Sequence, residues 1–138
     1  MSSDTVTGSC LCGSIKFEVK PPFANFRYCH CSRCQKASGS AHAANAFVPK
    51  AQFTWRAGEA HIKCYDVPGA QRFSVWFCEQ CGTRVPHQVR GRDDMLIPAG
   101  LLDQAPADMA RPENSIFWGS RAKWYVAPAD HPCHEQYT

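Results

Sequence analysis

Hydrophobic and polar side chains alternate in several short stretches of the chain. In residues 14–20, Ile15, Phe17 and Val19 fall on one face and charged side chains on the other, which is typical of a half-buried β-strand. Pro21-Pro22 ends this strand, because proline donates no hydrogen bond to a sheet. Alternating or aromatic, β-branched sequences predict further strands over residues 41–48, 53–56, 61–65, 72–77, 84–89 and 95–98.

Turn signals separate these predicted strands. Pro49 closes one of them, and Pro68-Gly69 indicates a turn before residues 72–77. We expect the strand over residues 84–89 to form a hairpin with that same stretch. Helical turns fit residues 35–40 and 101–103, and no long amphipathic helix is present. The sequence therefore predicts an all-β fold of small sheets with little helix.

Length and charge narrow the possible classes of function. At 138 residues the chain is long enough for a core of its own, so we expect a single domain over residues 1–138. Its net charge of +3 is too weak to indicate nucleic-acid binding, and no apolar run approaches the length of a membrane span. The first residues hold no basic region followed by an apolar one, so the expected location is the cytoplasm.

The cysteines are the chemistry-bearing residues that stand out. There are nine, an odd number that cannot be paired completely in disulfides. Seven fall in three stretches, C-x-C at 10–12, C-x-C-x-x-C at 29–34 and C-x-x-C at 78–81. Thiols this close in a reducing compartment suit a soft metal better than disulfides. Zinc is the expected metal, since it binds thiolates tetrahedrally at about 2.3 Å.

The first and third stretches together supply four sulfurs. Four thiolates close the coordination sphere of zinc, so Cys10, Cys12, Cys78 and Cys81 are expected to form a structural site. The alternative, a redox dithiol at the C-x-x-C, is disfavoured because such motifs open a helix and the residues after Gly82 are poor helix formers.

The middle stretch supplies three ligands, Cys29, Cys31 and Cys34, and leaves the fourth to be found. Three protein ligands and an open position are the pattern of a catalytic zinc. Such a site, with three thiolates, is suited to holding an external thiolate against an electrophile. The alternative is a closed, purely structural site, and His30 is a poor fourth ligand because it lies between two others. The candidates for closing the site are Cys64, Cys133, His87 and His134.

With their neighbours, these stretches resemble the glutathione-dependent formaldehyde-activating enzyme family, which also includes centromere protein V. The resemblance extends in order over roughly residues 7–127 and leaves 128–138 as a tail. It is carried by Gly8-Ser9-Cys10-Leu11-Cys12-Gly13, Cys29-His30-Cys31-Ser32-Arg33-Cys34-Gln35-Lys36 and Phe77-Cys78-Glu79-Gln80-Cys81-Gly82-Thr83.

The resemblance implies a β-tent of small antiparallel sheets with two zinc ions per chain. The family's structural ligands match Cys10, Cys12, Cys78 and Cys81, and those of its catalytic-type zinc match Cys29, Cys31 and Cys34. The implied activity is addition of glutathione to formaldehyde, a carbon–sulfur lyase reaction whose partners are a small thiol and a small electrophile. The alternative is a non-catalytic, zinc-stabilised binding module of the centromere protein V kind.

Two basic residues flank the second cysteine set. Arg33 and Lys36 are expected to bind the carboxylates of glutathione, and residues 114–118 to form a wall of its pocket. The alternative for both cations is a solvated turn.

Overall fold

The structure is a computed structural model that describes residues 5–106 and 111–137. The α-helix among these residues is α1 (Ser32–Ser38). The strands are β1 (Val6–Ser9), β2 (Lys16–Val19), β3 (Asn25–Cys29), β4 (Ala43–Pro49), β5 (Phe53–Ala57), β6 (Ile62–Asp66), β7 (Ser74–Cys78), β8 (His87–Gln88), β9 (Asp94–Pro98) and β10 (Asn114–Ile116). Single 3-10 turns occupy Lys50–Gln52, Glu59–His61, Ala99–Leu101, Trp118–Ser120 and Pro128–Asp130.

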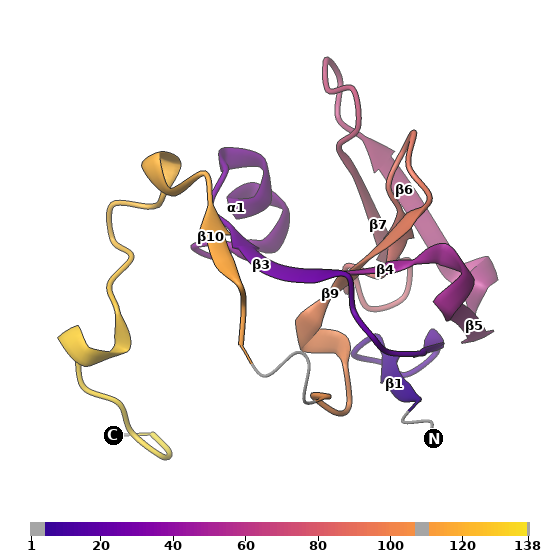
Figure 1. Ribbon diagram of the computed structural model, residues 1–138, viewed down its shortest axis with the longest axis horizontal. Helices are drawn as coiled ribbons and strands as arrows, with labels where there is room; N and C mark the ends of the chain where they lie inside the picture. The colour runs from indigo at the N-terminus through magenta and orange to yellow at the C-terminus, as the bar shows by residue number, and fades with distance from the viewer. Residues whose placement is uncertain (1–4, 107–110, 138) are drawn as a thin grey trace.

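The strands form three small sheets (Figure 1). Their orders are β1-β2-β5, β10-β3-β4-β9-β8 and β6-β7. The pairings are antiparallel except that of β10 with β3, which is parallel and places Ile116 opposite Cys29. Residues of α1, β6 and β7 line one cavity, which is described below.

The expected all-β class is confirmed, with α1 as the helical exception among residues 5–106 and 111–137. The strands β2, β4, β5, β6, β7 and β9 overlap the stretches that the sequence predicts. The hairpin expected for residues 84–89 is present only at its start: Arg84 forms a bridge to Phe77 and the Val85 amide donates to the Trp76 carbonyl over 2.8 Å, whereas His87 pairs with Leu96 of β9. The strands β1, β3 and β10 do not stand out in the sequence, because each is short and adjoins cysteines, prolines or a loop.

Two layers of apolar side chains hold the sheets together. Phe17 and Val19 of β2 meet Val48 of β4 and Ile97 of β9 in the main core, all four at 1% exposure or less. Burial of side chains of this size contributes about 1.5–3 kcal/mol each. A second cluster joins Cys10, Ile15, Cys78 and Val85, so the first cysteine set is itself part of the hydrophobic core.

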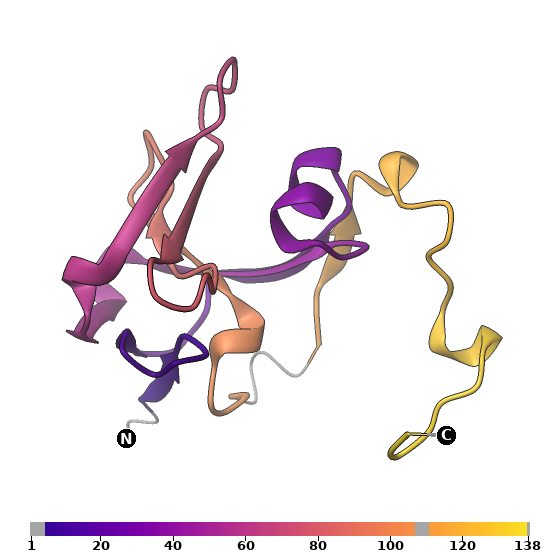
Figure 2. The same ribbon diagram turned by 180° about the vertical axis from the view of Figure 1, so that it is seen from behind.

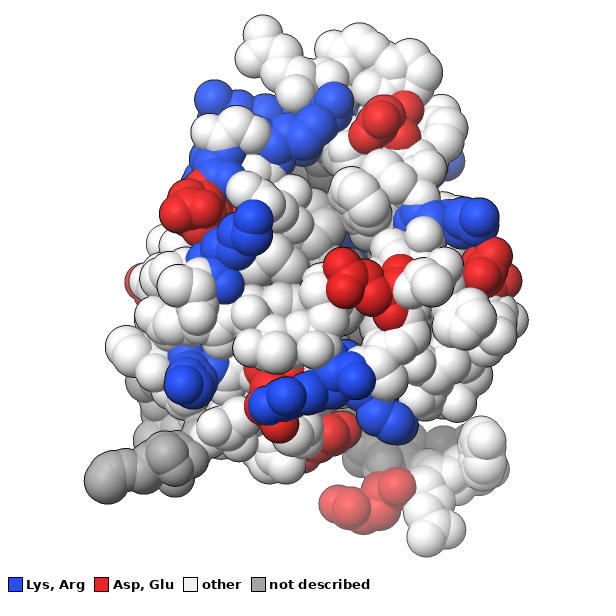
Figure 3. Space-filling model, turned by 90° about the vertical axis from the view of Figure 1, so that its right-hand side faces the viewer, with Lys and Arg blue, Asp and Glu red and all other residues white. Residues whose placement is uncertain are grey.

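The C-terminal part of the chain leaves the sheets. Figures 1 and 2 both show the residues after β10 running along the outside of the molecule, beyond α1. Every residue from 126 to 137 is exposed. None of the described helices is long and apolar enough to cross a membrane. On the face seen in Figure 3, basic and acidic side chains are interspersed rather than gathered by sign.

Candidate metal centres and adjoining cavities

The sulfurs of the first cysteine set converge at one point. Those of Cys10, Cys12, Cys78 and Cys81 all lie within 4.8 Å of one another. The Cys10 and Cys12 sulfurs are 3.7 Å apart, and those of Cys12 and Cys78 are 3.9 Å apart. Four sulfurs around zinc are expected about 3.8 Å apart. The geometry therefore fits a tetrahedral zinc ion.

Two tight turns produce this convergence. In the first turn the Gly13 amide donates to the Cys10 carbonyl over 3.0 Å, and in the second the Gly82 amide donates to the Cys78 carbonyl over 2.8 Å. Both glycines have positive φ angles, 80° and 79°, a conformation that a residue with a Cβ adopts at a cost. The Leu11 amide joins the turns by donating to the Thr83 hydroxyl over 3.0 Å.

The surroundings of Cys81, in this first set, favour its thiolate. The Thr83 side chain and backbone lower the pKa of Cys81 to about 5. Cys10 and Cys78 are buried, whereas Cys12 is exposed at the surface. Because four protein sulfurs fill the coordination sphere of zinc, a metal here would have a structural role.

The second set gathers where β3 turns into α1. Cys29 ends β3, Cys31 is the N-cap of α1 and Cys34 lies in its first turn, with all three sulfurs within 4.8 Å of one another. The Cys34 amide donates to the Cys31 sulfur over 3.3 Å. Burial raises the pKa of Cys34 well above its usual range, and the neighbouring Cys29 and Cys31 raise it further. A bound cation would relieve this mutual repulsion, so the donor set fits zinc.

None of the residues considered for closing the second set lies with it in the described part of the chain. Cys64 donates to the Asp66 carboxylate over 3.5 Å, and Cys133 donates to the Pro128 carbonyl over 3.7 Å in the C-terminal segment. His134 is exposed in that same segment. His87 packs on Trp76 elsewhere. His30 points into an aromatic cluster, with its ring centroid 5.0 Å from that of Trp118.

Two cavities adjoin the second set. The first, here named the helix cavity, lies between α1 and the β6–β7 sheet and has a volume of about 490 Å³. Arg33 and Lys36 both line it, together with Phe73, which packs against the three cysteines. The structure thus places both predicted cations in one cavity, which Phe73 links to the cysteine cluster, although Cys29, Cys31 and Cys34 do not line it. The remaining lining residues are Ser32, Ala37, Tyr65, Val67 and Val75.

The second, named the sheet cavity, has a volume of about 510 Å³ and shares Ala37 and Val75 with the helix cavity. Arg84 and Asn45 are among its polar lining residues. The Arg84 guanidinium lies over the Phe73 ring, 5.7 Å from the centroid. Burial lowers the pKa of Arg84, and the charges of Cys34, Cys29 and Cys31 oppose that shift. Arg84 therefore lines the sheet cavity and contacts Phe73, which lines the helix cavity, within electrostatic range of the three cysteines.

The model of the family described as glutathione-dependent formaldehyde-activating enzyme matches residues 5–120, which include both cysteine sets. The chain belongs to this family. A crystal structure of a Rhodobacter sphaeroides protein is similar, with a TM-score of 0.61 and 25% sequence identity over 79% of this chain and 98% of that chain. No curated protein matches the chain.

Residues 114–118 lie close to the second set of this family member, but in a different way from that expected. Ile116 packs against the cysteines, and its carbonyl accepts a hydrogen bond from the His30 amide over 3.0 Å. None of these residues lines the helix or sheet cavity. The segment therefore packs against the cysteine set without lining either cavity.

Neither Arg84 nor Phe73 is singled out by the sequence of this family member. Arg84 lies only three positions after Cys81, in a predicted strand, where a charged side chain is ordinarily solvated. Phe73 lies in the strand predicted over residues 72–77 and has no feature that distinguishes it there. The nearness of Arg84 to a metal-binding turn is the signal that the sequence does contain.

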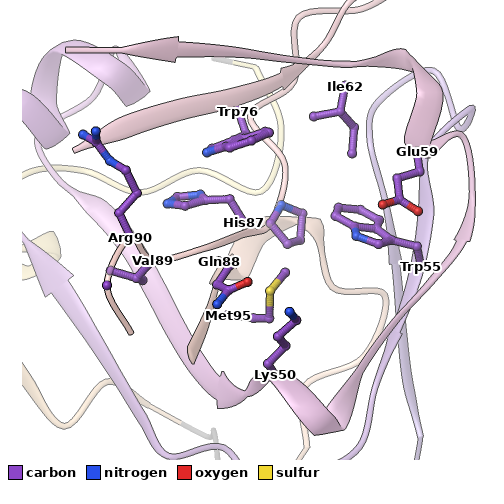
Figure 4. Close-up of a pocket in the computed structure, with 12 residues that line it drawn as sticks. Lys50, Trp55, Glu59, Ile62, Trp76, His87, Gln88, Val89, Arg90 and Met95 are labelled. Atoms are coloured by element: carbon purple, nitrogen blue, oxygen red, sulfur yellow. The ribbon is translucent and has the colours of Figure 1, made fainter. Parts of the chain in front are cut away.

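A third cavity lies on the opposite face of β7 (Figure 4). Successive residues of a strand point to opposite faces, so Trp76 lines this cavity whereas Val75 lines the other two. It has a volume of about 590 Å³, and Trp55 and His87 also contribute to its wall. Burial, aided by the charge of Arg84, lowers the pKa of His87 to about 4, so its ring is neutral at pH 7. The strand β7 separates this cavity from the second cysteine set.

Proposed function

We propose that this chain is a zinc-dependent carbon–sulfur lyase that adds a small thiol of the glutathione type to formaldehyde or a related small aldehyde. The observation that carries the proposal is that Arg33 and Lys36 line one cavity together with Phe73, which packs against the cluster of Cys29 and Cys34. Membership of the family supports the same class of chemistry.

Each cysteine set has its own part in this proposal. Cys10, Cys12, Cys78 and Cys81 would hold one zinc ion and fix the fold, while Cys29, Cys31 and Cys34 would hold a second. A zinc ion bound by three cysteines supplies a Lewis acid that lowers the pKa of a thiol at its fourth position. All nine cysteines are free thiols, which accords with the reducing cytoplasm as the proposed location.

The helix cavity would bind and orient the thiol. Glutathione carries two carboxylates, and the cations of Arg33 and Lys36 offer charge-assisted hydrogen bonds to them. Phe73 and Val75 give the cavity an apolar wall on the side of the cysteines. The tripeptide would be held with its charged groups toward α1 and its sulfur toward the cysteine set.

The reaction itself needs no oxidant or reductant. The thiol loses its proton to water, and its sulfur forms a bond to the carbonyl carbon. The electron pair of the carbonyl π bond moves to oxygen, which then takes a proton from water. The product is a hemithioacetal, and the residues of the cavity act by positioning the sulfur and limiting the access of water.

The test of this proposal separates glutathione recognition from thiol chemistry. In the zinc-loaded protein, replacing both Arg33 and Lys36 by alanine should raise the KM for glutathione about tenfold or more. The KM for 2-mercaptoethanol, which has no carboxylate, should not change. Lys20→Ala is the control, because Lys20 lines none of the three cavities described above. Equal effects on both thiols, or no thiol addition by the wild-type protein, would refute the proposal.

A further inference from the structure

Two residues that line the sheet cavity each carry a buried polar atom with unmet hydrogen-bonding capacity. Within the described chain, the Nε–H group of Arg84 and the Oδ1 atom of Asn45 are buried and have no hydrogen-bond partner. Both residues line this cavity, and Asn45 is 6% exposed. Buried polar groups nearly always have partners in folded proteins, so an unmet donor and an unmet acceptor on two residues of one cavity point to a ligand that offers an acceptor as substrate and a donor as product.

The charges around this cavity favour an uncharged ligand. Among the described residues that line it, none is an aspartate or a glutamate. Cys29, Cys31 and Cys34 lie within electrostatic range of Arg84, and as zinc-bound thiolates their three negative charges would exceed by one the two positive charges of the ion. The guanidinium therefore balances the cysteine set, and a carboxylate entering the cavity would meet the remaining negative charge once a thiolate is also bound.

The size and lining of the cavity favour a ligand larger than formaldehyde. A molecule of two heavy atoms needs little more room than a water molecule, whose share of the liquid is about 30 Å³. The cavity has a volume of about 510 Å³. Much of its wall is apolar, formed by Ala44, Val75, Phe77, Pro98 and Leu101. Such a wall with a few polar groups is typical of a site for a small organic molecule.

Resting on the thiol addition proposed above, we infer that the sheet cavity binds the electrophile, an uncharged aldehyde with a short apolar chain. Its carbonyl oxygen accepts a hydrogen bond from Arg84, and its chain lies against Phe77 and Leu101. When the carbon–sulfur bond forms, the carbonyl electron pair moves to the oxygen, where the guanidinium stabilises the charge before water supplies a proton. The new hydroxyl then donates to Asn45. Arg84 keeps its own proton throughout.

Kinetics with a series of aldehydes test the substrate class. With zinc-loaded protein and a fixed thiol concentration, kcat/KM for butanal should exceed that for formaldehyde at least tenfold. Glyoxylate, which carries a carboxylate, should be a poorer substrate than butanal. Arg84→Gln should lower kcat about 100-fold, the effect of losing one donor to a developing oxyanion. Arg84→Lys should restore part of this loss.

A substitution that fills the cavity gives a sharper test. Gly100 lines the sheet cavity, has no positive φ angle, and a Cβ added to it would meet no atom within 4 Å. Gly100→Leu should therefore fold normally and lower kcat/KM for butanal about tenfold, with formaldehyde little affected. Gly119→Leu is the matched control, because Gly119 is equally open but lines none of the three cavities.

A measurement of binding alone separates this inference from the proposed function. Butyramide keeps the carbonyl acceptor and chain of butanal but does not react with thiols. Added to ¹⁵N-labelled protein, it should shift the resonance of the Arg84 Nε–H group. This resonance is assigned as the one that is missing from the spectrum of Arg84→Lys. Gly100→Leu should weaken this titration, and Gly119→Leu should not.

The outcomes are distinct. A butyramide-dependent shift without turnover of any aldehyde supports the cavity assignment and refutes the thiol addition. Turnover of formaldehyde with no preference for butanal and no shift of Arg84 overturns the assignment and leaves the thiol addition standing. Saturable binding of glyoxylate tighter than butyramide would also overturn it, because the site would then be built for an anion.

Discussion

Replacing one cysteine from each set should have unlike consequences. Cys78 is fully buried in the core cluster with Cys10, Ile15 and Val85, and its sulfur belongs to the four-sulfur set. Cys31 is half-buried and belongs to the three-sulfur set at the start of α1. We expect Cys78→Ser to prevent folding and Cys31→Ser to leave a folded protein with about one zinc ion fewer.

The expected losses of stability follow from the surroundings of the two cysteines. Structural zinc contributes about 10–16 kcal/mol of binding free energy, which is comparable with the entire stability of a small domain, about 5–15 kcal/mol. A serine hydroxyl buried at position 78 without a hydrogen-bond partner would lower the stability by roughly a further 1–3 kcal/mol. At position 31, by contrast, serine is a favourable N-cap and can accept the hydrogen bond that the Cys34 amide now donates to sulfur. The loss there should be limited to the contribution of the second metal.

Zinc analysis and urea unfolding together provide the assay. Wild-type protein should hold two zinc ions and unfold cooperatively, and Cys31→Ser should retain the cooperative transition. Cys133→Ser is the control, because Cys133 is exposed in the C-terminal segment and belongs to neither set. A Cys78→Ser protein with two zinc ions and wild-type stability would refute the structural role of the first set. Loss of cooperative unfolding in Cys31→Ser would show that the second set also holds the fold together.

Two further predictions concern the folded chain. The pKa of His87 is about 4, below the ordinary 6.5, so stability due to its neutral ring is complete above pH 6.5 and falls by about 3 kcal/mol as pH drops toward 4. In urea unfolding at several pH values His87→Gln should show a shallower decline, and an unchanged slope would contradict this. Gly58 has a φ of 76°, and an added Cβ would lie 2.1 Å from the Ser14 carbonyl oxygen. Gly58→Ala should therefore destabilise the protein by about 2 kcal/mol or more in the same assay, whereas an effect below 0.5 kcal/mol would contradict the close approach.

The cysteine sets could be anticipated from sequence because their geometry is local. In C-x-x-C followed by glycine, as at Cys78 to Gly82, one turn fixes both sulfurs, and the structure places them within 4.8 Å. The alternation of Ile15, Phe17 and Val19 likewise fixes which face of β2 is buried, and all three are at 1% exposure or less.

The cavities could not be anticipated, because they depend on segments distant in sequence. Arg33 and Lys36 share a cavity only because Phe73 and Val75 are brought opposite α1 by the pairing of β6 with β7. The position of Arg84 near the cysteines depends on its bridge to Phe77 of β7, after which the chain changes partner and His87 pairs with β9. No periodicity in the sequence indicates that the chain changes its pairing from β7 to β9.

The stretch from Cys78 to His87 contributes residues to three parts of the molecule. Its cysteines belong to the first set, Arg84 faces the second set, and His87 lines the cavity beyond β7. Because the segment is so short, a structural change at its cysteines is expected to displace Arg84 as well. We therefore expect metal uptake to be hierarchical: the first set would be filled as the chain folds, and only then would Arg84 be in place beside the second. Zinc withdrawn by a chelator should leave in the opposite order, with the second set emptied while the fold persists.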